Sequence, residues 1–337
     1  MSKREESVTE ELFQPAEIDQ EKSEEIAGPS LSFWQDAWIS LRKNKAAIIG
    51  MIILVLLAFF AIFGSMIGPY DSSSQDLGRA NLPPRVPVLE DWGIMDGIDE
   101  MGNDMYEFKG VKDQYFWLGT DGLGRDLWSR IWQGTRISLY IALLAATIDM
   151  VIGVAYGGIS AYYGGRTDNV MQRIVEILVG IPNLIIVILM ILVMDPGIIS
   201  ITVALTITGW IGMSRIVRGQ ILKLKTQEFV LASRTLGSSD NKIITKHLIP
   251  NVMSVIVINT MFTIPAAIFF EAFLSFIGLG LQPPIASLGT LIEDGYRNMQ
   301  IFPHMMIYPS IVISLIMIAF NIVADGLRDA LDPKMRD

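Results

Sequence analysis

The stretch that decides the fold is AAIIGMIILVLLAFFAIFGSMIG, residues 46–68, in which 23 consecutive residues carry no charge. A helix needs about 20 apolar residues to cross the hydrocarbon core of a bilayer. The stretch is apolar on every side, whereas a helix on the surface of a soluble domain keeps one polar face. We therefore predict that residues 46–68 cross a membrane.

Five further apolar runs predict further crossings. Each lacks a polar face, as expected of a segment buried in lipid. Together with the first run they predict an all-α membrane protein with six transmembrane helices. Because 45 residues precede the first run, it is not a secretory signal peptide. The further runs lie at 137–163, 174–194, 198–214, 252–280 and 306–324.

The run at 252–280 is longer than one crossing requires. As a single helix it would extend about 43 Å, whereas the hydrocarbon core is about 30 Å thick. We therefore expect the helix to end near Glu271, with Ala272 to Leu281 forming a separate short element at the outer face. Pro265 breaks one backbone hydrogen bond of this helix, which is tolerated where the backbone lines a cavity or meets neighbouring helices.

The composition excludes several kinds of site. The chain has no cysteine, which excludes disulfides, thiolate metal sites and a cysteine nucleophile. It has two histidines, His247 and His304, too few and too far apart in sequence for a histidine metal site. It contains no G-x-x-x-x-G-K-[S/T] sequence, so it has no Walker A loop. We expect no cofactor or metal in this chain, and any hydrolysis of ATP must then occur on another chain.

The distribution of charge predicts an orientation, because basic residues mark the cytoplasmic side of a membrane protein. Residues 215–246 contain seven basic and two acidic residues, and basic residues also stand at 42–45 and 166–173. Residues 69–134 show the reverse, with twelve acidic and six basic residues. We therefore expect a multi-pass membrane protein with both termini in the cytoplasm.

The chain is predicted to consist of five segments. Residues 1–30 carry nine acidic residues and three basic ones, and few apolar side chains. Such a composition favours a disordered tail over a partner-binding helix. The segments are a disordered cytoplasmic tail over 1–32, an interfacial segment with the first span over 33–68, an extracellular segment over 69–134, a five-helix core with a loop at 227–250 over 135–328, and a cytoplasmic tail over 329–337.

The loop EFVLASRTLGSSDNKIITKHLIPN, residues 228–251, is polar and predicts two short helices. The first has a narrow apolar stripe formed by Phe229, Ala232, Ser233 and Leu236. Gly237 suits the left-handed position that ends a helix. Ser238, Ser239 and Asp240 are good N-caps for the second helix, which carries Ile243, Ile244, His247 and Leu248 on one side until Pro250. Two interpretations remain open: an ordinary basic loop, and a rigid knob that docks into a groove on a cytoplasmic partner.

The same loop resembles the EAA loop of bacterial ABC-importer permeases. That pattern is Glu-Ala-Ala, three residues, Gly, nine residues, Ile, one residue and Leu-Pro. Residues 231–233 fall on Glu-Ala-Ala, Gly237 on the glycine, His247 on the isoleucine, and 249–250 on Leu-Pro. Leu231 therefore stands where the pattern has Glu. The resemblance implies contact with an ATPase by Phe229, Leu231, Ala232, Ser233, Leu236, Gly237, His247 and Pro250.

Two other stretches narrow the resemblance. FWLGTDGLGRDLWSRIWQGTRISL, residues 116–139, and FFEAFLSFIGLGLQPPIASLG, residues 269–289, resemble segments beside the second and fifth spans of peptide-importer permeases. With its separate first span, the chain over roughly 33–333 resembles the C-type permease subunit of oligopeptide and dipeptide ABC importers. The resemblance implies the type I importer permease fold with cytoplasmic coupling helices, and a subunit that forms half of an oligopeptide pathway. A dipeptide or nickel importer of the same family is the alternative.

The family also implies a location in the bacterial cell membrane and a set of partners. These are a sister permease in a heterodimer, two cytoplasmic ATPases that bind ATP and Mg²⁺, and an external peptide-binding lipoprotein. The chain itself would be non-catalytic, would bind peptide and lipid, and would not bind nucleic acid.

Polar residues inside the spans are candidates for the pathway, because such residues usually face the bundle interior. Each either makes an interhelical hydrogen bond or lines the pathway. They are Asp149, Glu176, Asn183, Asn259, Glu271 and Asn321.

The sequence GTDGLGRD, residues 119–126, could be mistaken for a phosphate or calcium loop. It lacks both a preceding strand and a closing glutamate. We expect a turn here, followed by an interfacial helix with Trp117, Trp128 and Trp132 at the level of the lipid headgroups.

Two functions from other classes are disfavoured. An ion-coupled secondary transporter would show an internal repeat with broken helices, and no such repeat is visible. An intramembrane serine protease would need a Ser–His pair at depth, whereas both histidines are expected near the membrane faces.

Overall fold

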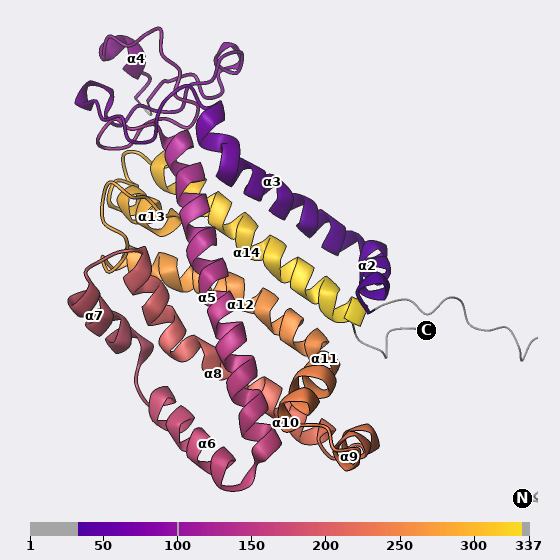
Figure 1. The fold of residues 1–337 in the computed structure, drawn as a ribbon. Coiled ribbons are helices and arrows are strands. Elements are labelled where there is room, and N and C mark those ends of the chain that lie inside the picture. Colours follow the sequence, from indigo (N-terminus) through magenta and orange to yellow (C-terminus); the bar gives the residue numbers. More distant parts are fainter. Residues whose placement is uncertain (1–32, 100, 332–337) are drawn as a thin grey trace, which may run out of the picture.

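The computed structural model describes residues 33–99 and 101–331, which are helical with irregular connections and isolated β-bridges (Figure 1). The predicted tails over 1–32 and 332–337 lie outside the described residues. The longer helices are α2 (Phe33–Lys43), α3 (Lys45–Ile67), α5 (Leu127–Tyr163), α6 (Gly165–Val179), α7 (Asn183–Met194), α8 (Ile198–Leu224), α9 (Glu228–Thr235), α12 (Met253–Phe276), α13 (Leu288–Arg297) and α14 (His304–Leu331).

Five of the described helices are long and apolar enough to cross a membrane, namely α3, α5, α8, α12 and α14. The predicted span at 174–194 is not one straight helix. It is divided between α6 and α7, which meet at an angle of 81° across a break at 180–182. Pro182 accounts for the break, because a proline disfavours helical geometry in the residue before it. Counting this bent pair as one span gives the six predicted crossings.

The bundle has two distinct ends (Figure 1). Residues 68–126 form an irregular segment at one end, called here the loop end. They include two short 3₁₀ turns and the one-turn helix α4 (Met105–Phe108). Residues 226–251 lie at the opposite end, called here the hairpin end. The two segments that the charge distribution assigns to opposite sides of the membrane are therefore at opposite ends of the molecule.

The central contact of the bundle is between α5 and α8, and small residues allow it. A Cβ atom added to Gly153 would lie 2.7 Å from the carbonyl oxygen of Trp210, and one added to Gly157 would lie 2.3 Å from that of Ser214. Neither distance leaves room for a side chain. The two backbones therefore approach closely, as in other membrane helix pairs with small residues at the interface.

The first span packs against the rest of the bundle through a similar stripe. Its buried residues include Gly50 and Gly64, which face α14 and Trp132 of α5. Asn44 caps the helix by accepting a hydrogen bond from the backbone N–H of Ala47 at 3.2 Å. The opposite face exposes Ile52, Val55 and other large apolar side chains, as expected of a surface covered by lipid.

Helix α12 differs from the prediction that it ends near Glu271. It continues to Phe276, and residues 277–287 are irregular, so the predicted separate element at 272–281 is wrong. Glu271 is fully buried and accepts hydrogen bonds from Ser138 at 3.0 Å and Ser275 at 2.8 Å. The Ser138 hydroxyl also accepts from the backbone N–H of Leu288. This network joins α5, α12 and α13, which is why the helix passes through Glu271 without a break.

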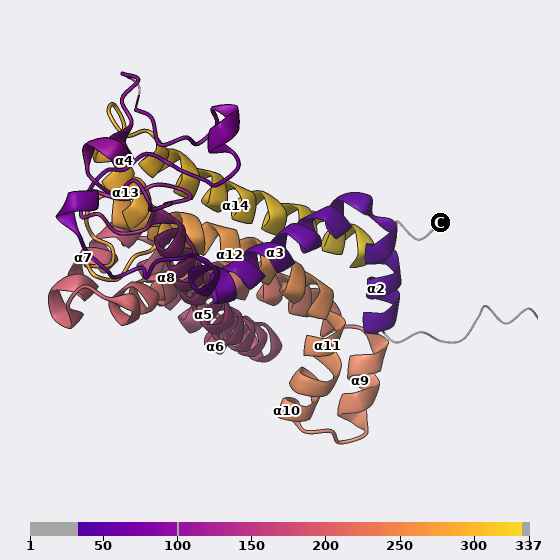
Figure 2. The ribbon, with the colours of Figure 1, turned by 90° about the horizontal axis from the view of Figure 1, so that it is seen from above.

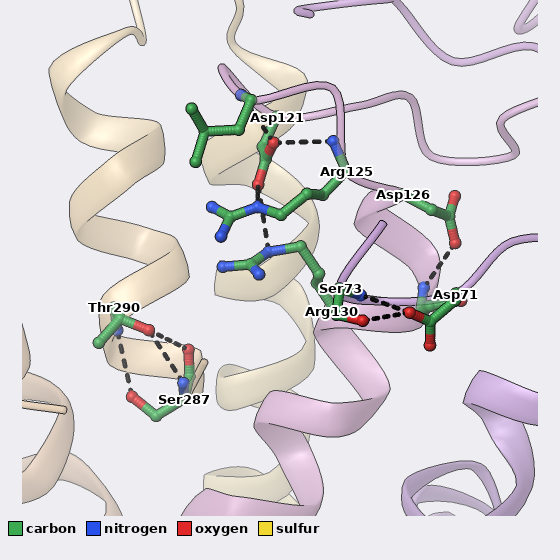
Figure 3. Close-up of polar contacts among 10 residues, drawn as sticks. Asp71, Ser73, Asp121, Arg125, Asp126, Arg130, Ser287 and Thr290 are labelled. Carbon is green, nitrogen blue, oxygen red and sulfur yellow. Dashed lines mark hydrogen bonds and ion pairs between the residues drawn. The ribbon is translucent and has the colours of Figure 1, made fainter. Parts of the chain in front are cut away.

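The stretch 119–126 forms a closed turn at the loop end (Figure 3). The Asp121 carboxylate accepts hydrogen bonds from the backbone N–H groups of Leu123 and Arg125, and its Oδ2 lies 2.7 Å from Nε of Arg125 and 3.2 Å from Nε of Arg130. Protein groups therefore occupy both oxygens of this carboxylate. Asp126 then caps α5 by accepting from the backbone N–H of Ser129 at 2.9 Å.

Helix α5 begins directly at Leu127, which corrects two predictions. The described chain has no separate interfacial helix after the turn, and the boundary at 134/135 falls inside α5. Similarly, α14 continues to Leu331, past the predicted boundary at 328/329. Trp132 is buried and stacks on Phe60 with ring centroids 4.8 Å apart, so it is not a headgroup anchor. Trp128 contacts both Trp117 and Trp132 and donates a hydrogen bond to the Gly64 carbonyl.

Candidate functional site

The loop 228–251 folds into a helical hairpin that projects from the bundle (Figure 2). Its first arm is α9, and Gly237 follows at a φ of +78°. The Gly237 N–H donates to the Arg234 carbonyl at 3.0 Å, and the Ser238 N–H donates to the Ser233 carbonyl at 3.1 Å. These two bonds define a Schellman motif, which requires a left-handed residue at Gly237. The glycine thus ends the first arm as its position in the sequence predicts.

The second arm is helical but irregular. It consists of α10 (Asp240–Lys242), a π-helical turn (Ile243–Leu248) and α11 (Ile249–Asn251). Ser239 is the N-cap residue, although its side chain makes no capping bond. Turns of π-helix are rare and often occur at functional sites.

One face of the hairpin is buried against the bundle. Val230, Ile243 and Leu248 have no exposed surface and pack in one cluster with Val217 and Ile221 of α8. Ser233, predicted to belong to the docking stripe, is only 9% exposed and lies on this buried face. The hairpin is therefore joined to α8 by a continuous apolar core.

Polar contacts join the hairpin to the end of α5. The Tyr162 hydroxyl donates to the Asp240 carboxylate at 2.6 Å, and the Arg234 guanidinium lies over the Tyr162 ring, 5.3 Å from its centroid. Lys225, which follows α8, donates to the Ala161 carbonyl at 2.7 Å. Both arms of the hairpin thus contact Tyr162.

The opposite face of the hairpin exposes apolar side chains. Leu236 is 86% exposed, Leu231 48% and Phe229 42%. Ala232 and Gly237 are exposed between them, and Pro250 is exposed on the second arm, whereas His247 is half-buried. Exposed apolar groups on a projecting, well-anchored element favour the interpretation as a docking knob over that of an ordinary loop.

Three of the six polar residues predicted in the spans line one cavity. Asp149 of α5, Asn183 of α7 and Asn259 of α12 surround a space of about 400 Å³ between these helices and α8. Thr208 of α8 donates a hydrogen bond to the Asn183 carboxamide at 2.8 Å.

The other three predicted residues lie elsewhere. Glu176 is exposed on α6 and pairs with Arg173 at 2.6 Å. Glu271 belongs to the buried network described above, which corresponds to the alternative of an interhelical hydrogen bond. Asn321 is exposed on α14.

The sequence did not single out the residues that hold the hairpin end together. Asp168 of α6 binds Arg218 of α8 through two hydrogen bonds of 2.7 and 2.6 Å, and it also accepts from Ser160 of α5. Tyr162 was missed as well. The sequence offers one indication of Asp168, which is an acidic residue among the basic residues at 166–173. Nothing near it in the sequence indicates that its partner is Arg218, fifty positions later.

Comparisons with known proteins give a consistent result. Residues 150–337 match the family model of the binding-protein-dependent transport system inner membrane component, and residues 32–84 match that of the N-terminal TM domain of oligopeptide transport permease C. The chain is 44% identical over 330 residues to the oligopeptide transport system permease protein OppC of Bacillus subtilis, which covers 98% of this chain and 99% of the relative.

Two dipeptide permeases are equally similar. The dipeptide transport system permease protein DppC of Bacillus subtilis is 45% identical over 324 residues, covering 95% of this chain and 92% of the relative. DppC of Lactococcus lactis is 46% identical over 325 residues, covering 93% and 94%.

Proposed function

The chain belongs to the family of binding-protein-dependent transport system inner membrane components, and from this premise we propose that it is the permease subunit of an ATP-driven peptide importer. Its helices would form half of the peptide pathway, and a sister permease would form the other half, because one such subunit cannot enclose a channel. Relatives named for oligopeptides and for dipeptides are similarly close, so the substrate class that they support is the peptide.

The observation that carries the proposed mechanism is the hairpin with an exposed apolar tip and a buried base. The tip offers Phe229, Leu231 and Leu236 to a groove on an ATPase, and the base is packed against α5 and α8. When ATP closes the ATPase pair, the hairpin moves as one body and tilts these helices. The coupling depends on the hairpin contacting the two states of the ATPase differently.

In this proposal the ATP-hydrolysing and peptide-capturing subunits of the importer are other chains. ATP and Mg²⁺ are bound by two ATPases in the cytoplasm, and this chain is non-catalytic. The hairpin end and both termini face the cytoplasm, where basic residues concentrate. The acidic loop end faces outward, toward a peptide-binding lipoprotein.

Site-specific cross-linking tests the coupling. The chain has no cysteine, so an Ala232→Cys variant carries a single site for a benzophenone maleimide. We expect illumination of the assembled complex to join this residue to an ATPase chain. Leu77→Cys, which places the same probe at an exposed position of the loop end, is the matched control and should give no such product. An intact complex that never yields the Ala232 adduct would overturn the proposed docking.

Transport itself is tested in proteoliposomes that contain the whole complex. Uptake of labelled dipeptides and oligopeptides, the substrates that the relatives are named for, should require ATP and the binding protein. Uptake that proceeds without the ATPases would favour an ion-coupled carrier instead.

A further inference from the structure

The cavity between α5, α7, α8 and α12 is lined mostly by apolar and uncharged residues. Its volume of about 400 Å³ lies in the usual range of about 300–1,000 Å³ for ligand sites. Asp149 is the one ionisable residue among the described residues that line it, and the others are apolar, small or uncharged polar. The cavity therefore combines a single negative group with largely neutral walls.

Asp149 is placed in the cavity without a partner for its charge. The residue is 6% exposed, and its Oδ1 atom has no hydrogen-bond partner among the described residues. Gly209 of α8 makes room for the carboxylate, because a Cβ atom there would lie 2.1 Å from Oδ2. A buried carboxylate without a cation or several donors is costly, so a site of this kind favours a positively charged ligand.

The neighbouring groups suit an ammonium group joined to a peptide backbone. The Asn259 amide nitrogen donates to the Val255 carbonyl, and the Asn183 oxygen accepts from Thr208. The Asn259 oxygen and the Asn183 amide nitrogen thus remain as an acceptor and a donor on residues that line the cavity. Phe262 and Phe270 also line the cavity, and the faces of aromatic rings attract cations.

We propose that Asp149 receives the α-ammonium group of the peptide as it passes through the membrane. This inference rests on the proposed function and names the part of the substrate that the permease itself recognises. The α-ammonium group is common to peptides of every sequence. The cavity is also lined by small residues, such as Ala204, Gly212 and Ala266, which do not select among the side chains of the peptide.

The test compares trialanine with its des-amino analogue, propionyl-Ala-Ala, in proteoliposomes that hold the complete complex. Both are supplied at saturating concentration with the binding protein, so that the maximal rate reports a step after delivery. Because hydrogen bonds to a charged group are stronger than those between neutral groups, we expect the wild type to transport trialanine at least about tenfold faster than the analogue. Asp149→Asn should lower the maximal transport rate of trialanine to that of the analogue, so that the ratio of the two rates approaches one.

Glu271→Gln is the matched control. It makes the same change at another buried carboxylate, whose two oxygens already accept hydrogen bonds from Ser138 and Ser275. The ratio between the two substrates should survive in this variant. A ratio that persists in Asp149→Asn, or collapses equally in Glu271→Gln, would overturn the proposal.

A second measurement uses the wild-type complex and so does not depend on the folding of a variant. Dicyclohexylcarbodiimide modifies carboxyl groups within membranes, and mass spectrometry can locate the modification. Trialanine should protect Asp149, whereas propionyl-Ala-Ala should not, and protection by neither would refute the inference. Absence of ATP-driven uptake by the wild type would instead refute the proposed function, which separates the two failures.

Discussion

Leu236 provides the sharpest test of how the hairpin docks. Its side chain is 86% exposed at the tip, next to the glycine that ends α9. Complete burial of a leucine side chain contributes about 1.5–3 kcal/mol. Because alanine retains one carbon and the leucine is not fully exposed, Leu236→Ala should remove about 1–2 kcal/mol of binding free energy, which raises the Kd for the ATPase about 5–30-fold.

The stability of the permease should hardly change in this variant. Substitutions at exposed positions usually alter the free energy of unfolding by no more than about 0.5 kcal/mol. Leu77→Ala makes the same chemical change at an exposed leucine of the loop end, 74% exposed, and is therefore the control for nonspecific effects.

The assay is a titration of purified ATPase onto nanodiscs that contain the permease pair, with the Kd measured by biolayer interferometry. We expect weaker binding for Leu236→Ala and unchanged binding for Leu77→Ala. If Leu236→Ala binds like the wild type, the exposed face of α9 does not enter the ATPase, and the contact must lie elsewhere.

Two further predictions concern Gly237 and Asp126. A side chain at Gly237 meets no atom of this chain within 4 Å, so the leucine of Gly237→Leu would overfill the groove on the ATPase and should abolish uptake. The left-handed backbone also costs a branched residue about 1–2 kcal/mol, whereas Gly237→Asn, with a smaller side chain that tolerates this conformation, should retain uptake. Membrane insertion of both variants is checked by fractionation, and peptide-stimulated ATPase activity that is unchanged in Gly237→Leu would contradict the docking. Burial raises the pKa of Asp126 to about 6, so the folded protein binds more protons than the unfolded chain between about pH 4 and 6. Protonation of Asp126 therefore stabilises the folded protein at low pH. This contribution to the free energy of unfolding, up to about 3 kcal/mol, is lost as the pH rises through this window. Asp126→Asn keeps an N-cap and should abolish the pH dependence of the free energy of opening that hydrogen exchange reports for the amides around 119–130. A pH dependence that is unchanged in this variant would show that another group titrates.

The sequence predicts most of the bundle, because lipid leaves few options to an apolar segment. A long run without charge must satisfy its own backbone, and a helix does so within the segment. The hairpin is likewise predictable, since Gly237 and the serines after it specify where one helix ends and the next begins. These features depend on residues close together in the chain.

The errors concern features that depend on distant residues. The predicted end of α12 near Glu271 rests on the length of the apolar run, which exceeds one crossing of the hydrocarbon core. In the structure this carboxylate is held by Ser138, which lies 133 positions earlier in the chain. The aromatic ring of Trp132 packs on Phe60 of another helix rather than on lipid, which no local pattern indicates. The bend between α6 and α7 had a local signal in Pro182, hidden within a run that is otherwise apolar.

The length of α5 has a mechanical consequence. Its 37 residues make an unbroken rod of about 55 Å, attached near one end to the Asp121 turn through Arg130 and near the other to the hairpin through Tyr162. When this rod pivots by about 5° where Gly153 and Gly157 contact α8, its end near Leu127, about 40 Å away, moves by about 4 Å, so a small stroke at the hairpin end is enough to displace groups at the loop end. The subunit can in this way act as a lever whose fulcrum is the close contact of Gly153 and Gly157 with α8.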